Sequence, residues 1–244
     1  EEATVVEHLS ELRHRIFIGL GSLVPGFVVA FVFHGEIIEW LKAPLPDDKE
    51  LITLGVTEPF TTSVKVAALT AVAVALPILL WQIWSFLAPA VEESIQRVLV
   101  GFVAFGTALF AAGVAFSYYI IMPKALTFLT NFGDELFEVQ IRASYYFSFV
   151  TMMMLATGLA FQMPIFLLAL ARLGVVSSAK LRRNRRFALV GLLAFAILLP
   201  TVDPVSLALE VVPLFVLFEL SIWLIAMMER RWERSYYDGY FETP

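Results

Sequence analysis

Long apolar segments dominate this sequence and constrain its fold more than any other feature. A hydrocarbon core about 30 Å thick is crossed by about 20 helical residues. Lipid offers the backbone no hydrogen-bond partners, so each span must be a helix. Six segments have this character, at roughly 16–34, 61–84, 98–122, 146–171, 187–202 and 205–228. The sequence therefore predicts an all-α, polytopic membrane protein whose six transmembrane helices form one domain over residues 1–244.

The fifth segment, 187–202, is the short one, because Arg186 precedes it and Asp203 follows it. Sixteen helical residues span about 24 Å, which predicts local bilayer thinning or a hydrated flank. Because this span is short and the loop at 35–60 is large enough to cap it, we expect a concave bundle. Four prolines fall inside spans and predict kinks that neighbouring helices tolerate: Pro25, Pro77, Pro164 and Pro213.

Composition excludes several classes of protein. The chain is 59% hydrophobic and 16% charged, whereas soluble domains are about half apolar and a quarter charged. It has no cysteine, which excludes disulfides and cysteine metal sites. We find no histidine–carboxylate spacing for a metal, and no HExxH, GxSxG or phosphate loop. The sequence predicts neither an enzyme nor a cofactor. The polar first fifteen residues lack a signal-peptide pattern, so we expect the first apolar run to be retained.

Loop charge predicts the orientation of the chain in the membrane. With the N-terminus on one side, 12 of the 17 basic residues fall on that side and five on the other. The positive-inside rule then places both termini in the cytoplasm. We expect a cytoplasmic amphipathic helix at 1–15, a periplasmic cap loop at 35–60 and a cytoplasmic tail at 229–244. The stretch GEIIEWLKAPL within that loop predicts a short amphipathic helix.

The stretch EHLSELRHR, residues 7–15, is polar in an otherwise apolar chain. Thr4 and Glu7 fit a capping box, which predicts a helix from about residue 5. Glu11 and Arg15 lie four apart on one helical face, a spacing that favours an ion pair worth a few tenths of a kcal/mol. The alternative is that Glu11 is available to a cationic ligand, and the spacing leaves both interpretations open.

The stretch WQIWSFLAPAVEESIQR ends the second apolar segment and begins a cytoplasmic turn. Trp81 and Trp84 are typical of an aromatic belt at the membrane interface. Pro89 ends the helix, and Glu92 and Glu93 follow it. Two adjacent carboxylates are unusual on the side that favours Lys and Arg. They form either an ordinary solvated turn or part of a binding surface.

A few polar residues fall within or beside the apolar segments, where they are costly and face the bundle interior or water. Gln162 and Glu219 suit a functional role or helix packing, Asp203 follows the fifth segment, and Glu210 falls near the start of the sixth. The basic run KLRRNRR at 180–186 is typical of a cytoplasmic anchor, which also suits anionic lipid. Nucleic-acid binding is not expected beside a membrane span.

Several stretches, in order along nearly the whole chain, resemble the TatC family, the membrane receptor of twin-arginine protein translocation. They are EHLSELRHR (7–15), LKAPL (41–45), TEPF (57–60), PILLWQIWSFLAPA (77–90), AFQMP (160–164), the basic run before the short fifth segment, PTVD (200–203) and VPLFVLFELSIW (212–223). Each stretch is weak evidence alone, and their order makes the resemblance specific.

The resemblance implies a function without catalysis. Such a protein binds the Arg-Arg signal peptides of folded precursors in the bacterial or archaeal cytoplasmic (inner) membrane. It assembles with TatA-type and TatB-type single-span proteins, and export is driven by the proton-motive force. The expected partners are therefore twin-arginine precursors, these single-span proteins, further copies of the chain and membrane lipid, with no nucleic acid.

The resemblance also places site residues. In the signal-binding surface it implies Glu11 together with Phe86 and Pro89 of the following loop. With their neighbours, the predicted signal-binding residues are Leu9, Glu11, Arg13, Phe86, Pro89, Glu92, Glu93 and Arg97. The predicted partner-helix or intramembrane polar residues are Gln162, Asp203 and Glu219, and the predicted cap residues are Pro44, Glu58 and Phe60.

Two departures from the family pattern bear on these assignments. The glutamate that the family carries in the first cytoplasmic loop falls on Ile95 here, and Arg97 matches the family's second arginine of that loop. We hypothesise that Glu92 or Glu93, about one helical turn away or less, supplies the missing charge. Gln162 stands where many members carry a glutamate, which weakens any proposal of an obligatory titrating group there.

A second function remains open at this stage. Gln162, Glu210 and Glu219 at membrane depth are compatible with an ion-coupled small-solute secondary transporter. Such transporters often show repeated halves and Gly-interrupted spans, and the sequence shows no repeated halves.

Overall fold

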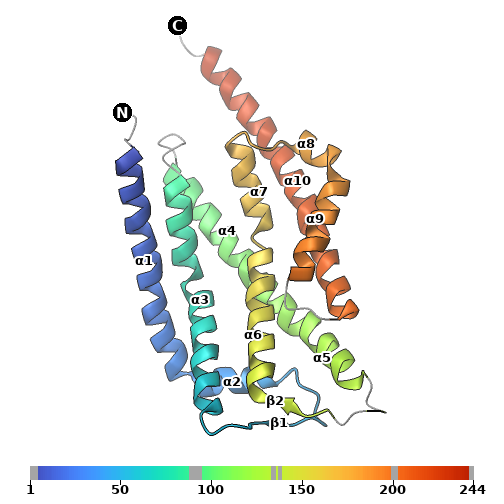
Figure 1. Ribbon diagram of the computed structural model, residues 1–244. Coiled ribbons are helices and arrows are strands. Elements are labelled where there is room, and N and C mark those ends of the chain that lie inside the picture. The colour runs from blue at the N-terminus through green and yellow to red at the C-terminus, as the bar shows by residue number, and fades with distance from the viewer. Residues whose placement is uncertain (1–4, 88–94, 133–135, 137–138, 199–202, 242–244) are drawn as a thin grey trace. The chain divides into compact units, whose positions relative to one another are not determined.

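The computed structural model describes residues 5–87, 95–132, 136, 139–198 and 203–241, which form two compact units (Figure 1). The first unit covers residues 1–158 and the second residues 159–244. The prediction of an all-helical fold is confirmed: apart from one pair of two-residue strands, every element of the described chain is a helix.

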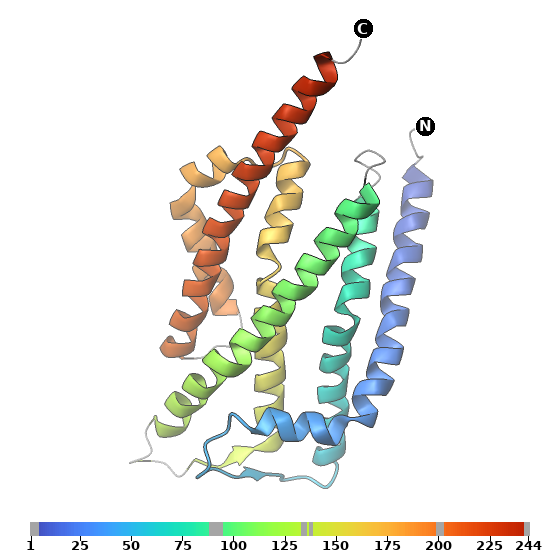
Figure 2. The same cartoon turned by 180° about the vertical axis from the view of Figure 1, so that it is seen from behind.

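The first unit contains most of the described helices and both strands. Helices α1 (Val5–Val32) and α3 (Glu58–Leu87) run side by side over much of their length (Figures 1 and 2). Between them in sequence lie α2 (His34–Lys42) and β1 (Leu51–Ile52). The remaining elements are α4 (Ile95–Phe116), the π-helical turn η2 (Ser117–Ile121), α5 (Met122–Asn131), β2 (Ile141–Arg142) and α6 (Ala143–Ala160). Strands β1 and β2 pair in parallel, Leu51 opposite Ile141.

The second unit is built around one long helix. Helix α10 (Pro204–Phe241) packs against α7 (Met163–Arg172), α8 (Ser178–Arg183) and α9 (Arg185–Leu198). Its core gathers Leu192 and Ala196 of α9 with Leu214, Phe218 and Ile222 of α10. The last three residues recur at intervals of four, which is the spacing of one helical face.

Within the described residues, five helical stretches are long and apolar enough to cross a membrane: Leu9–Val32, Glu58–Phe86, Val100–Asn131, Ala143–Arg172 and Pro204–Glu229. They correspond to the first, second, third, fourth and sixth predicted segments, and the chain is a polytopic membrane protein. The predicted fifth segment is helical as α9, whose 14 described residues span about 21 Å, and residues 199–202 of that segment lie outside the described residues. The count of six spans therefore stays a prediction, as does the concave bundle.

The prolines inside spans have different effects. Pro25, Pro77 and Pro213 lie within continuous helices. Near Pro164, the predicted fourth span is divided at residues 161–162 into α6 and α7. Helix α1 is described from Val5 onward and joins the predicted amphipathic helix and the first span into one helix. Thr4 of the capping box lies outside the described residues.

Glycines bring two pairs of helices into close contact. A Cβ atom on Gly26 of α1 would lie 3.1 Å from the carbonyl oxygen of Ala71 in α3. A Cβ atom on Gly158 of α6 would lie 2.6 Å from the ring of Phe110 in α4, which is buried. Side chains at these two positions would force the helices apart.

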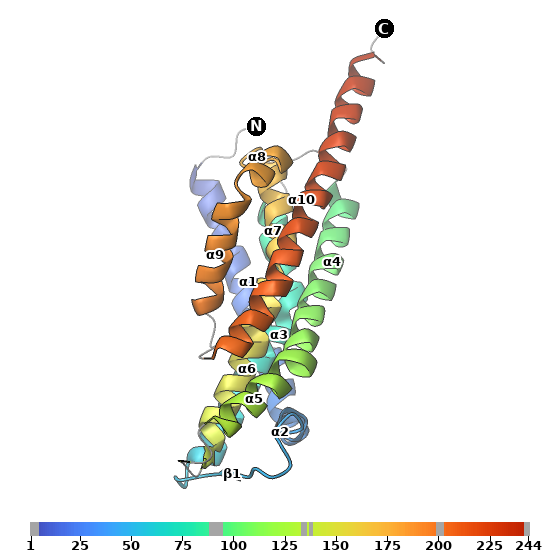
Figure 3. The ribbon, with the colours of Figure 1, turned by 90° about the vertical axis from the view of Figure 1, so that its right-hand side faces the viewer.

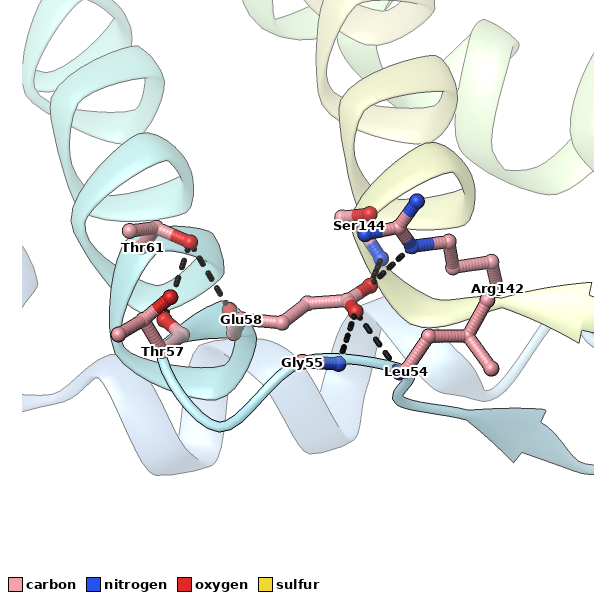
Figure 4. Close-up of polar contacts among 7 residues, drawn as sticks. All are labelled: Leu54, Gly55, Thr57, Glu58, Thr61, Arg142 and Ser144. Carbon is pink, nitrogen blue, oxygen red and sulfur yellow. Dashed lines mark hydrogen bonds and ion pairs between the residues drawn. The ribbon is translucent and has the colours of Figure 1, made fainter.

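The loop predicted as a cap, residues 35–60, comprises α2, β1 and the turn before α3, and Glu58 bonds it to Arg142 of β2 (Figure 4). Glu58 is buried at the first position of α3. Its Oε2 accepts hydrogen bonds from the backbone N–H groups of Leu54 (2.9 Å) and Gly55 (3.3 Å). Its Oε1 accepts from Arg142 Nε (2.9 Å) and the N–H of Ser144 (3.2 Å). All four partners donate, so the site suits an ionised carboxylate and joins the turn before α3 to the start of α6.

Two tyrosines fasten α2 to the same unit. The hydroxyl of Tyr118 in η2 donates to the carbonyl of Trp40 at 2.7 Å, and that of Tyr146 in α6 donates to the carbonyl of Leu41 at 2.9 Å. The rings of Trp40 and Tyr118 stack with centroids 4.0 Å apart. The carbonyl of Trp40 also accepts from the backbone N–H of Ala43 at 3.1 Å, so the two tyrosines add side-chain donors to the carbonyls of the last turn of α2.

We predict that Glu58→Gln destabilises the cap, because it removes the charge and turns one acceptor oxygen into a donor facing other donors. Thermal unfolding in detergent should begin several degrees lower than in the wild type. Glu39→Gln is the control, since Glu39 is an exposed carboxylate on α2. Equal unfolding temperatures for the two variants would contradict the role assigned to Glu58.

We predict that Gly158→Ala lowers stability by about 1–3 kcal/mol, the usual cost of overpacking a core. The measurement is again thermal unfolding in detergent. The control is Gly101→Ala in α4, whose added Cβ would meet nothing within 4 Å. Since alanine is the better helix former by about 1 kcal/mol, the control should be as stable as the wild type or more so. A fall of the same size in both variants would refute the close packing of α4 and α6.

Candidate functional site

A groove lies between the N-terminal half of α1 and the C-terminal end of α3, within the first unit. Its volume is about 340 Å³. It is lined by Leu12, Arg15, Ile16, Gly19, Leu20, Leu79, Gln82, Ile83 and Phe86. The wall is almost entirely apolar, and Arg15 and Gln82 are its polar members. Gly19 helps to shape the wall, since a Cβ atom there would lie 3.3 Å from Leu79 Cδ2.

The ion pair favoured by the sequence is present at this groove. Arg15 donates from Nε (3.0 Å) and from a terminal nitrogen (2.5 Å) to the same Glu11 oxygen, Oε1. Oε2 accepts no hydrogen bond from any residue that the structure describes. The Glu11 side chain is 37% exposed and that of Arg15 is 22% exposed. Glu11 is therefore a paired carboxylate that solvent and ligands can still reach.

The pair is weak by the standards of buried ion pairs. It joins residues four apart on one helix, where such pairs contribute about 0.3–0.5 kcal/mol. A guanidinium group from another chain could replace that of Arg15 at little energetic cost. The arrangement can thus exchange one bound cation for another beside an apolar groove.

The other residues of the predicted signal-binding surface fall into two groups. Leu9 and Arg13 are exposed on α1, and Phe86 lines the groove. The structure thus brings Phe86 to the groove that Arg15 borders. Pro89, Glu92 and Glu93 lie outside the described residues, as does the side chain of Arg97, although Arg97 itself belongs to α4.

Sequence reasoning missed the α3 wall of the groove, formed by Leu79, Gln82 and Ile83. Their spacing of three and four residues marks one helical face. That signal could have identified an α3 surface but not its pairing with α1.

The predicted intramembrane polar residues do not form one site. Glu219 of α10 accepts a 2.7 Å hydrogen bond from Arg185 at the start of α9. Asp203 is buried and caps α10, where its Oδ1 accepts from the N–H of Ser206 at 2.8 Å. These two acids are sixteen residues apart, or about 24 Å along a helix. Gln162 sits at the break between α6 and α7.

The predicted cap residues have separate surroundings. Glu58 holds the network described above, Phe60 is exposed with its ring edge toward Phe31, and Pro44 follows α2 half-buried. Among the described residues, no group of three or more His, Asp or Glu side chains could hold a metal ion.

Comparison with known proteins agrees with this architecture. Residues 7–213 match the family model of the Sec-independent protein translocase protein TatC. The TatC protein of Synechocystis sp. is 38% identical, over 85% of this chain and 82% of that protein. TatC of Helicobacter pylori J99 is 35% identical, over 91% and 88%, and TatCd of Bacillus subtilis is 32% identical, over 95% of both chains.

Solved structures extend the similarity to the fold. A crystal structure of the twin arginine translocase receptor TatC in DDM matches with a TM-score of 0.80 and 33% identity. The match covers 90% of this chain and 99% of that one. On the evidence of the family model, the relatives and the fold, the chain belongs to the TatC family of Sec-independent protein translocase components.

Proposed function

We propose that this chain binds the Arg-Arg signal peptides of folded precursors, and that Glu11 is the carboxylate that receives a signal arginine. The observation that carries the proposal is the exposed Glu11–Arg15 pair beside the apolar groove. Family membership supports this reading over that of a small-solute transporter, as does the separation of Glu219 from Asp203 along α10.

In this proposal Arg15 occupies the place of the incoming arginine when no signal is bound. Arg15 contacts one oxygen of Glu11, whereas a guanidinium from outside the helix can take both oxygens in a bidentate geometry. The ammonium group of a lysine cannot form this bidentate pair of hydrogen bonds. Apolar residues of the signal then lie against the groove and along the spans, with Leu9 and Phe86 as apolar contacts.

We predict opposite effects of two substitutions on the binding of an Arg-Arg signal peptide by the purified chain in detergent. Glu11→Gln removes the anion and should weaken binding at least tenfold, the loss expected for a charge-assisted bond of about 1.5–3 kcal/mol. Arg15→Gln removes the competing cation and should strengthen binding about twofold, given a pair worth about 0.3–0.5 kcal/mol.

Two controls accompany these variants. Arg183→Gln makes the same change in charge at an exposed position of the second unit and should leave the affinity unchanged. A Lys-Lys version of the peptide should bind more weakly to the wild type. Equal affinity for the two peptides would overturn the receptor function. Weaker binding of the Arg-Arg peptide by Arg15→Gln would contradict the proposal that a signal arginine replaces Arg15 at Glu11.

We further propose that Glu92 or Glu93 supplies the second carboxylate, because the family's loop glutamate falls on Ile95 in this chain. The double variant Glu92→Gln, Glu93→Gln should bind the Arg-Arg peptide about tenfold more weakly, with the preference over Lys-Lys reduced. The charge-matched control is Glu36→Gln with Glu39→Gln in α2, both exposed. Unchanged affinity in the Glu92 and Glu93 variant would leave Glu11 as the only carboxylate contact.

The same proposal covers the membrane in which the chain works, its orientation there and the proteins with which it assembles. The chain works in the cytoplasmic (inner) membrane with both termini in the cytoplasm, which the 12 to five distribution of basic residues supports. TatA-type or TatB-type single-span helices pack along the fifth and sixth spans, where Phe195 and Ile197 of α9 and Val216 of α10 are exposed apolar residues. Further copies of the chain join them, and the proton-motive force drives export.

A further inference from the structure

The corner between α8 and α9 concentrates positive charge on a fixed scaffold. Five cations occur within seven residues: Lys180, Arg182, Arg183, Arg185 and Arg186. Helix α8 is held in place because Ser178 donates its backbone N–H (3.0 Å) and its hydroxyl to the two carboxylate oxygens of Glu229 in α10. Figure 3 shows α8 at the end of α9.

The same scaffold places these cations within the apolar length of α10. Ser178 is tied to Glu229, at the end of the apolar stretch Pro204–Glu229. Arg185 is tied to Glu219. These two acids are ten residues apart, so the basic corner extends about 15 Å along α10 from the end of that stretch.

Among the side chains that the structure describes, few compensate the positive charge at this corner. Arg185 is paired with Glu219, and the ammonium of Lys180 donates to the carbonyl of Val175. Arg186 lies over the ring of Phe187, 4.9 Å from its centroid. Arg182 and Arg183 are exposed and form no ion pair with any side chain that the structure describes. Cations at membrane depth require anions or water.

Apolar side chains continue directly from the cations. Phe187 is 63% exposed and Val190 is 66% exposed on α9. In a membrane protein, such side chains face acyl chains or a partner helix.

We propose that this corner is a binding site for an anionic phospholipid. Arg182, Arg183 and Arg186 hold its phosphate, and its acyl chains lie on the exposed face at Phe187 and Val190. Guanidinium groups bind phosphate oxygens through paired N–H donors, and the acyl chains account for the apolar surface beside them. A phospholipid would contact both the arginines and the apolar face, whereas a soluble phosphate would contact the arginines alone. This proposal does not depend on signal-peptide binding.

The test counts lipids bound to the full chain in nonionic detergent by native mass spectrometry. Phosphatidylglycerol and phosphatidylcholine with the same acyl chains are titrated separately. Phosphatidylglycerol should bind more tightly. Because each cation near an anionic surface contributes about fivefold in affinity, Arg182→Gln with Arg183→Gln should weaken this binding about 25-fold. Arg182→Lys with Arg183→Lys keeps the charge and should weaken phosphatidylglycerol binding less than the double glutamine variant does.

The matched control is Lys42→Gln with Lys124→Gln, two exposed cations of the first unit, which should bind phosphatidylglycerol as the wild type does. Thermal unfolding of each variant checks that it is folded. Equal binding of the two lipids, or an equal loss in the control, would overturn the site. Displacement of the lipid by glycerol 3-phosphate would show a soluble phosphate site instead. Retained phosphatidylglycerol binding in the arginine double variant would show that the lipid binds elsewhere on the chain and would also overturn the site.

Discussion

The lack of hydrogen-bond partners in hydrocarbon decides how this chain uses its few acids. A carboxylate near a membrane span must meet donors or water, and three of the acids described here do so by joining elements. Glu58 links the turn before α3 to the start of α6, Glu219 links α10 to α9, and Glu229 links α10 to α8. In a protein of this composition, these acids form polar contacts between elements that otherwise pack mainly through apolar side chains.

Glu11 differs from these three glutamates in ways that suit the binding of a cationic ligand. Its partner Arg15 lies on its own helix, both bonds reach one oxygen, and the pair is partly exposed. Breaking it leaves no buried charge and separates no elements. Glu58, by contrast, receives four donors from residues up to 86 positions apart. A glutamate thus has a structural role where several donors from distant parts of the sequence bind it. Where its one partner lies on the same helix, another cation can replace that partner.

The sequence predicts what depends on composition and on short-range spacing. Five of the six apolar segments are helices of spanning length, and the Glu11–Arg15 pair follows from a separation of four residues. The bond between Glu58 and Arg142 joins positions 84 apart, and no local pattern indicates it. The groove likewise depends on how α1 and α3 pack. The break near Pro164, in a chain where Pro25 leaves its helix continuous, shows that the effect of a proline depends on its neighbours.

The start of α9 is fixed by its antiparallel partner. Arg185 at the start of α9 is bonded to Glu219, and Asp203 caps the start of α10. Sixteen residues separate Asp203 from Glu219, about 24 Å along a helix, and the 14 described residues of α9 cover about 21 Å. Moving the start of α9 would require breaking this ion pair or moving Arg185 farther along α10. The start of this helix is therefore set by where charge is satisfied.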